Sequence, residues 1–100
     1  MSRFADVISR QLDLFEREQA ALIEDCETAE LKYDQAGREN AEERYADYLD
    51  LVETGTEELA AMRDHFGSAM DEESAEQYED EFNRAVAQRL PRFALEIEDT

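Results

Sequence analysis

A single histidine and a large excess of carboxylates are the residues of this chain that could bind a metal ion. Helical bundles that hold a pair of iron ions use Glu-x-x-His motifs, but the residue three positions before His65 is Met62. The acidic run of residues 71–81 lacks the spaced oxygens and the central glycine of a calcium-binding EF-hand loop. The run contains Asp71, Glu72, Glu73, Glu76, Glu79, Asp80 and Glu81. We therefore expect no resident metal ion and no cofactor.

Nucleophilic catalysis finds equally little support. The chain has four serines, four threonines and one cysteine, and no Ser lies in a Gly-x-Ser-x-Gly turn. Cys26 falls in the apolar stripe of a predicted helix, where it reads as a small buried hydrophobic residue, and no spacing places it on a turn next to His65. We expect a protein that is not an enzyme.

The charge balance restricts the possible partners. Twenty-eight acidic residues stand against ten Lys and Arg, which gives a net charge of −18. Such a chain repels nucleic-acid phosphates and anionic membrane surfaces, so we expect neither as a partner, whereas a basic protein remains possible. The sequence contains no apolar segment of about seven residues typical of a secretory signal, and no apolar run of about 20 residues. We expect a cytoplasmic protein.

The elements that must position these residues are long helices, because three Gly and one Pro leave little material for turns. Apolar residues of the segment 41–66 alternate steps of four and three, which is the seam of a packed helix. They are Ala41, Tyr45, Tyr48, Val52, Gly55, Leu59, Met62 and Phe66. Because the pattern passes through Gly55 without a slip, we predict a continuous helix in which a large side chain such as Phe15 or Phe82 fills the space above Gly55. The alternative is a break at residues 54–57.

Two further helices flank this seam. The segment 2–36 carries an apolar stripe about four heptads long, interrupted by one polar residue, Gln19, which either fixes the register by hydrogen bonding or is partly exposed. The segment 72–98 carries a third stripe, and Pro91 should kink that helix or end it. Short connections make consecutive helices antiparallel neighbours. The sequence thus predicts an all-α fold: one domain, residues 1–100, forming an elongated, antiparallel, up-down-up three-helix bundle.

The N-terminal part of the first helix has more apolar residues than one slender bundle can cover. Phe4, Val7 and Leu14 widen its stripe, and Phe93 and Leu95 lie near the other end of the chain. From this surplus we predict a homodimer that covers the N-terminal face, with Phe93 and Leu95 contributing to it.

Arginines recur every seven residues on the first helix. Arg3, Arg10 and Arg17 have Asp6 and Asp13 at helical i±3 and i±4 spacing, so an Arg/Asp ladder on the outer face is the plain expectation. The alternative is a docking stripe, since this is the only ordered basic feature of an acidic chain.

These patterns together favour a non-enzymatic protein–protein interaction or assembly module that acts as a homo-oligomer. The first alternative is an acidic decoy or inhibitor that occupies the basic, nucleic-acid-binding surface of another protein. The second alternative is a carboxylate metal-binding helical bundle.

Overall fold

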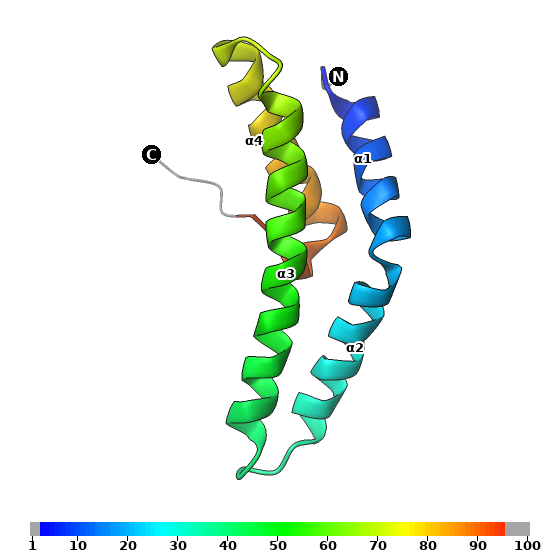
Figure 1. The fold of residues 1–100 in the computed structure, drawn as a ribbon, viewed down its shortest axis with the longest axis vertical. Coiled ribbons are helices and arrows are strands. Elements are labelled where there is room, and N and C mark those ends of the chain that lie inside the picture. Colours follow the sequence, from blue (N-terminus) through cyan, green and yellow to red (C-terminus); the bar gives the residue numbers. More distant parts are fainter. Residues whose placement is uncertain (1–2, 96–100) are drawn as a thin grey trace.

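The computed structural model of the chain describes residues 3–95, and the ordered elements in that range are helical. They are α1 (Ala5–Glu18), α2 (Ala20–Gln35), α3 (Ala41–Gly67), α4 (Glu72–Arg89) and the short 3-10 helix η1 (Pro91–Phe93). The molecule is elongated, with extents of 51 × 32 × 22 Å. Figure 1 shows α1 and α2 descending, α3 returning along the whole length, and α4 descending again over the upper half only. The all-α class is confirmed, and the order of directions is the predicted one.

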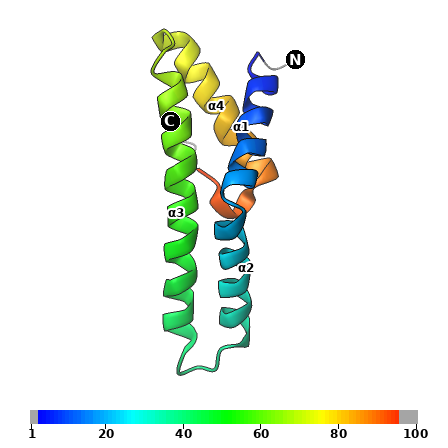
Figure 2. The ribbon, with the colours of Figure 1, turned by 45° about the vertical axis from the view of Figure 1, so that its right-hand side comes forward.

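The predicted single helix 2–36 is wrong, because the chain bends at Gln19 and forms two helices. The Gln19 N–H still donates to the Phe15 carbonyl at 2.8 Å, and the Ile23 N–H donates to the Gln19 carbonyl at 3.0 Å. The bend follows from a change of packing partner: α1 lies against α4, whereas α2 lies along α3 (Figure 2). A four-helix chain therefore replaces the predicted three-helix bundle.

The predicted third helix 72–98 also requires correction. Its start is right, since Asp71 caps α4 by accepting a hydrogen bond from the Ser74 N–H at 2.8 Å, and the hydrogen bonds from Ser74 hold the pKa of Asp71 below its usual value. The α-helix ends at Arg89, in accord with the second of the two outcomes predicted for Pro91, and the chain turns into η1. Residues 96–98 of the predicted helix lie outside the described residues.

The helix α3 is continuous through Gly55, as predicted, but the large neighbour is Phe93 and not Phe15 or Phe82. A Cβ atom built on Gly55 would lie 2.6 Å from Cδ1 of the Phe93 ring. Phe93 is 2% exposed, and its ring packs edge-on against Phe15 with 5.7 Å between ring centroids. The chain reversal at Pro91 thus inserts an aromatic ring between α1 and the middle of α3.

The hydrophobic core surrounds this ring and occupies the upper and middle parts of the molecule. It consists of Ile8, Leu12, Phe15, Cys26, Leu59, Tyr78, Phe82, Val86, Phe93 and Leu95. Two buried polar groups find partners within it. The Tyr78 hydroxyl donates to the Gln11 side-chain carbonyl at 2.8 Å, and the buried Asn83 side-chain oxygen accepts from Arg63 at 3.0 Å. No helix within the described residues is long and apolar enough to cross a membrane.

Candidate interaction surfaces

The residues predicted to form one N-terminal interface separate into two groups. Phe93 and Leu95 are 2% and 7% exposed and belong to the chain's own core, so we remove them from the predicted interface. Their positions in the sequence do not show that η1 folds back onto Gly55, so they look like a surplus there. The other three lie at the start of α1 or on it. Phe4, which directly precedes the helix, packs edge-on against Tyr78 with 5.5 Å between ring centroids. Val7 is half-buried against the core, and Leu14 is 41% exposed.

The three arginines Arg3, which precedes α1, and Arg10 and Arg17, which belong to it, differ in their contacts. Arg3 donates a hydrogen bond to the Ser74 hydroxyl at 3.3 Å and lies over the Phe4 ring. Arg10 and Arg17 are exposed, and within residues 3–95 no carboxylate approaches either guanidinium to 4.0 Å. The predicted Arg/Asp ladder is therefore not formed. Asp13, which should bridge Arg10 and Arg17, is paired with Arg89 of α4 instead.

Sequence reasoning missed a second apolar surface on the lower half of the α2–α3 hairpin. Four large hydrophobic side chains are exposed there: Leu31 (55%), Tyr33 (38%), Tyr45 (45%) and Leu49 (42%). The rings of Tyr33 and Tyr45 contact each other across the two helices in a tilted arrangement, with 5.2 Å between centroids and 47° between ring planes. The sequence did contain one indication of this surface, which is the difference in length between two predicted helices. The apolar seam of the helix 41–66 is longer than a third helix that ends at Pro91 can cover.

The position of this surface follows from the contacts of η1. Arg92 donates to the Tyr48 hydroxyl at 3.2 Å and to the Glu30 carboxylate at 3.0 Å, so Glu30 and Tyr48 mark the face against which the C-terminal segment packs. Tyr33 and Tyr45 each lie three residues further down their helix, on the same face. In the described chain, α4 ends above this point, and no third helix lies against the lower hairpin (Figure 1). We call Tyr33, Tyr45 and Leu49 the hairpin face.

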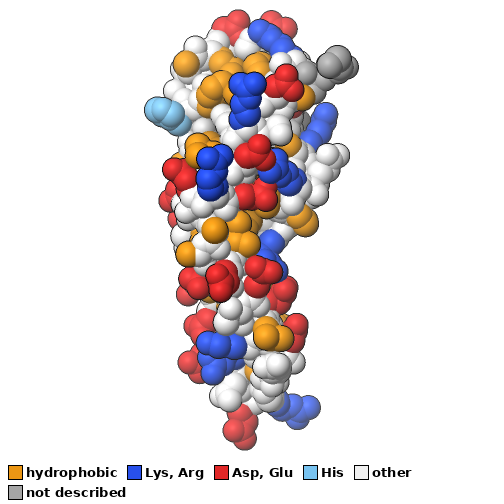
Figure 3. Space-filling model, turned by 90° about the vertical axis from the view of Figure 1, so that its right-hand side faces the viewer, with side chains coloured by type: hydrophobic (Ala, Val, Ile, Leu, Met, Phe, Trp, Pro, Cys, Tyr) orange, Lys and Arg blue, Asp and Glu red, His pale blue; other side chains and the backbone are white. Residues whose placement is uncertain are grey.

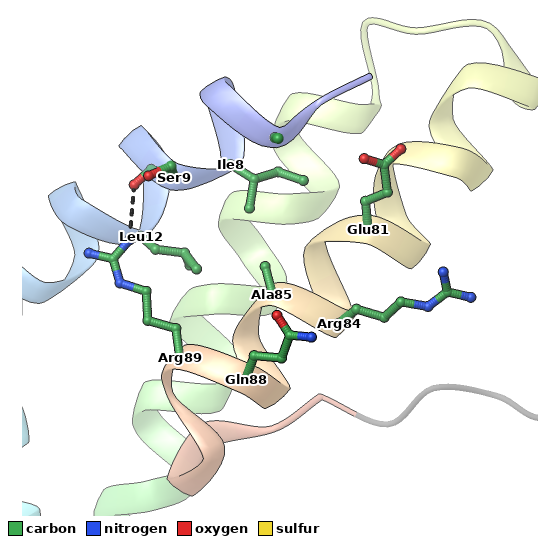
Figure 4. A pocket seen from close by; sticks show the side chains of 9 residues that line it. Ile8, Ser9, Leu12, Glu81, Arg84, Ala85, Gln88 and Arg89 are labelled. Carbon is green, nitrogen blue, oxygen red and sulfur yellow. Dashed lines mark hydrogen bonds between the residues drawn. The ribbon is translucent and has the colours of Figure 1, made fainter. Parts of the chain in front are cut away.

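A groove of about 490 Å³ separates α1 from α4 (Figure 4). Ile8, Leu12 and Ala85 form its apolar floor, and Ser9, Glu81, Arg84, Gln88 and Arg89 lie along its rim. Arg89 donates to the Ser9 carbonyl at 3.3 Å and pairs with Asp13 and Glu16. These contacts raise the pKa of Arg89, chiefly through the hydrogen bond to Asp13. Arg89 thus ties α4 to α1 beside this groove.

Other residues that could do chemistry are placed as follows. Cys26 is fully buried, and burial raises the pKa of its thiol, which makes the reactive thiolate rare. His65 is exposed at the end of α3. Within residues 3–95 no three His, Cys, Asp or Glu side chains converge closely enough to hold a metal ion. The alternative of a carboxylate metal-binding bundle gains no geometric support.

Comparison with known proteins adds no relative: no protein-family model, no curated protein and no solved structure matches this chain. Functional inference therefore rests on the surfaces of the molecule itself.

Proposed function

We propose that the protein is a non-enzymatic assembly module of the cytoplasm that forms a homodimer through the hairpin face. The observation that carries the proposal is the uneven length of the helices. At 1.5 Å per residue, the 27 residues of α3 extend over about 40 Å, whereas the 18 residues of α4 extend over about 27 Å. The lower part of the hairpin therefore has two helices where the upper part of the molecule has three.

The side chains of the hairpin face are of the types that protein interfaces favour. Tyrosine is enriched at interfaces because its ring buries a large apolar area while its hydroxyl keeps a polar partner. The rings of Tyr33 and Tyr45 already contact each other, and Leu49 lies one turn from Tyr45 on the same helix. A two-helix hairpin of this kind gains a core when a second hairpin packs on it and completes a four-helix arrangement.

A second copy is the occupant that the apolar centre of this face favours. A two-fold axis brings the same patch of both chains together, so that the apolar centre of one hairpin face meets that of the other. The surrounding acidic residues of the two chains repel each other, and salt screens this repulsion. We therefore expect the dimer to become more stable as the salt concentration rises.

The substitution Leu49→Arg tests this proposal. An arginine at this exposed position leaves the fold intact and places a charge at the centre of the interface. Sedimentation of the wild-type protein at micromolar concentration should give about twice the 11.6 kDa mass of one chain, and Leu49→Arg should give the mass of one chain.

The matched control is Leu14→Arg, which makes the same change at an equally exposed leucine on α1, outside the hairpin face. Leu14→Arg should remain dimeric. A wild-type protein that sediments as a monomer contradicts the homodimer, and a Leu49→Arg variant that sediments as a dimer contradicts the interface.

The acidic decoy is the weaker candidate. Glu72, Glu73, Glu76, Glu79 and Asp80 are exposed, which a basic partner would require. Acidic side chains are, however, distributed over much of the surface that Figure 3 shows and are not focused on one patch. We therefore place self-assembly first.

A further inference from the structure

We propose that the chain segment 91–95, which we call the strap, regulates self-assembly. Its docking onto the α2–α3 hairpin holds the hairpin face in the shape that a second copy binds. This inference rests on the homodimer proposed above and adds the device that controls it. The strap consists of η1 and the two residues that follow it, and it begins where Pro91 ends α4.

The strap is an ordered part of the fold. Phe93 is 2% exposed and fills the space above Gly55, and Leu95 is also buried. The N–H groups of Phe93 and Ala94 donate to backbone carbonyls at 2.9 and 3.2 Å. Exchange of these two amide protons therefore reports how firmly the strap is docked.

Arg92 joins the strap to both helices of the hairpin. Its Nε donates to the Tyr48 hydroxyl of α3 at 3.2 Å, and its Nη2 donates to the Glu30 carboxylate of α2 at 3.0 Å. The guanidinium also lies over the Tyr48 ring, 5.9 Å from the centroid. The Arg92 side chain is 24% exposed, and hydrogen bonds of a charged donor are stronger where water is partly excluded. Arg92 thus bridges α2 and α3 and fixes how the two helices lie against each other.

This bridge lies next to the hairpin face. Tyr33 follows Glu30 by three residues on α2, and so lies about one turn below the bridge. Tyr45 precedes Tyr48 by three residues on α3, which places it at the same level. The rings of the two lower tyrosines contact each other with 5.2 Å between centroids. A rotation or separation of the helices would part these rings, and in the described chain no third helix lies against the lower hairpin to prevent it (Figure 1).

A docked strap therefore preorganises the surface that the second copy binds, which reduces the entropy lost on association. Coupling between two equilibria is reciprocal. If docking of the strap favours the dimer, formation of the dimer must in turn stabilise the docked strap, although the second copy binds one turn away from it. A strap that only supports the fold of its own chain would show no such dependence on association.

The substitution Arg92→Met tests the bridge, because it keeps an unbranched apolar side chain and removes the contacts to both helices. Sedimentation over a range of concentrations should show that the dissociation constant of the homodimer rises at least about fivefold. The matched control is Arg89→Met, which removes the same charge from an arginine that pairs with Asp13 and Glu16 of α1. It should leave the dissociation constant within about twofold of the wild-type value.

Hydrogen exchange of the wild-type protein supplies the second measurement. Exchange of the Phe93 and Ala94 amides should slow at least about threefold as the concentration passes from below to above the dissociation constant. In the monomeric Leu49→Arg variant the same amides should exchange at one rate at all concentrations.

The Leu49→Arg variant also isolates the effect of the bridge on a single chain. Adding Arg92→Met to it should speed exchange of the amides around Tyr33 and Tyr45 and leave those around the buried Tyr78 unchanged.

The possible outcomes separate this inference from the homodimer itself. A wild-type protein that sediments as a monomer overturns both. A wild-type dimer whose dissociation constant is unchanged by Arg92→Met, or rises equally with Arg89→Met, overturns the role of the strap alone. So does exchange of the strap amides that does not depend on concentration, and this result needs only the wild-type chain, so it decides the question even where Arg92→Met fails to fold.

Discussion

Replacing Phe93 by alanine is expected to lower the free energy of unfolding by about 3 to 5 kcal/mol, as for other buried Phe→Ala changes. Phe93 is 2% exposed and its ring connects three elements: it contacts Phe15 of α1, covers Gly55 of α3 and anchors η1. The substitution leaves a cavity at the point where these elements meet. Since domains of this size have total stabilities of about 5 to 15 kcal/mol, the loss is a large part of the whole.

Urea unfolding followed by circular dichroism measures this loss. The matched control is Phe66→Ala, which removes the same ring from a position 37% exposed at the end of α3, and which should cost much less. If Phe93→Ala and Phe66→Ala lowered the free energy of unfolding equally, the central packing role of the Phe93 ring would be contradicted.

Replacing Gly55 by valine is the second change with a large expected effect. Its Cβ would lie 2.6 Å from Cδ1 of Phe93, closer than carbon atoms can pack, and the buried ring has little room to retreat. Overpacking of a core typically costs about 1 to 3 kcal/mol. The better helix propensity of valine recovers only a few tenths of a kcal/mol. We expect a net loss of about 2 kcal/mol.

A double-mutant cycle assigns this loss to the Phe93 ring. In a Phe93→Ala background, Gly55→Val should cost nothing or should stabilise the protein, because the valine fills part of the cavity. Gly67→Ala is the control for helix propensity, since its Cβ would lie at an ordinary 3.8 Å from Tyr78. A loss from Gly55→Val that persists in the Phe93→Ala background would contradict the contact.

The contact between Gly55 and the Phe93 ring shows what the sequence could predict and what it could not. The uninterrupted 3-4 spacing through Gly55 correctly indicated a continuous helix with a close neighbour, because the spacing reports which side of a helix is buried. It carries no information about which segment lies there. Phe93 reaches Gly55 only because Pro91 ends α4 and reverses the chain, and the direction of a chain reversal is a tertiary property.

The bend at Gln19 was missed for a related reason. The apolar stripe continues through residue 19 with nearly helical spacing, and the backbone hydrogen bonds continue on both sides of it. What separates α1 from α2 is that one packs on α4 and the other on α3. Of the two alternatives for Gln19, the structure favours partial exposure.

The candidate surfaces were predicted only in part. Residue spacing identified the repeat of Arg3, Arg10 and Arg17, because seven-residue repeats on a helix can be read directly. It could not show that Asp13 is paired with Arg89. The hairpin face depends on where α4 ends relative to α3, so it became visible only once the helices were placed side by side.

The most direct test of the proposed assembly is hydroxyl-radical labelling of the protein at concentrations below and above the dissociation constant of the homodimer. The account predicts that labelling of Tyr33, Tyr45 and Leu49 falls severalfold as the protein associates, while labelling of the equally exposed Leu14 and Phe66 stays constant. Association that leaves the labelling of the hairpin face unchanged, or that protects Leu14 instead, would contradict the proposed homodimer.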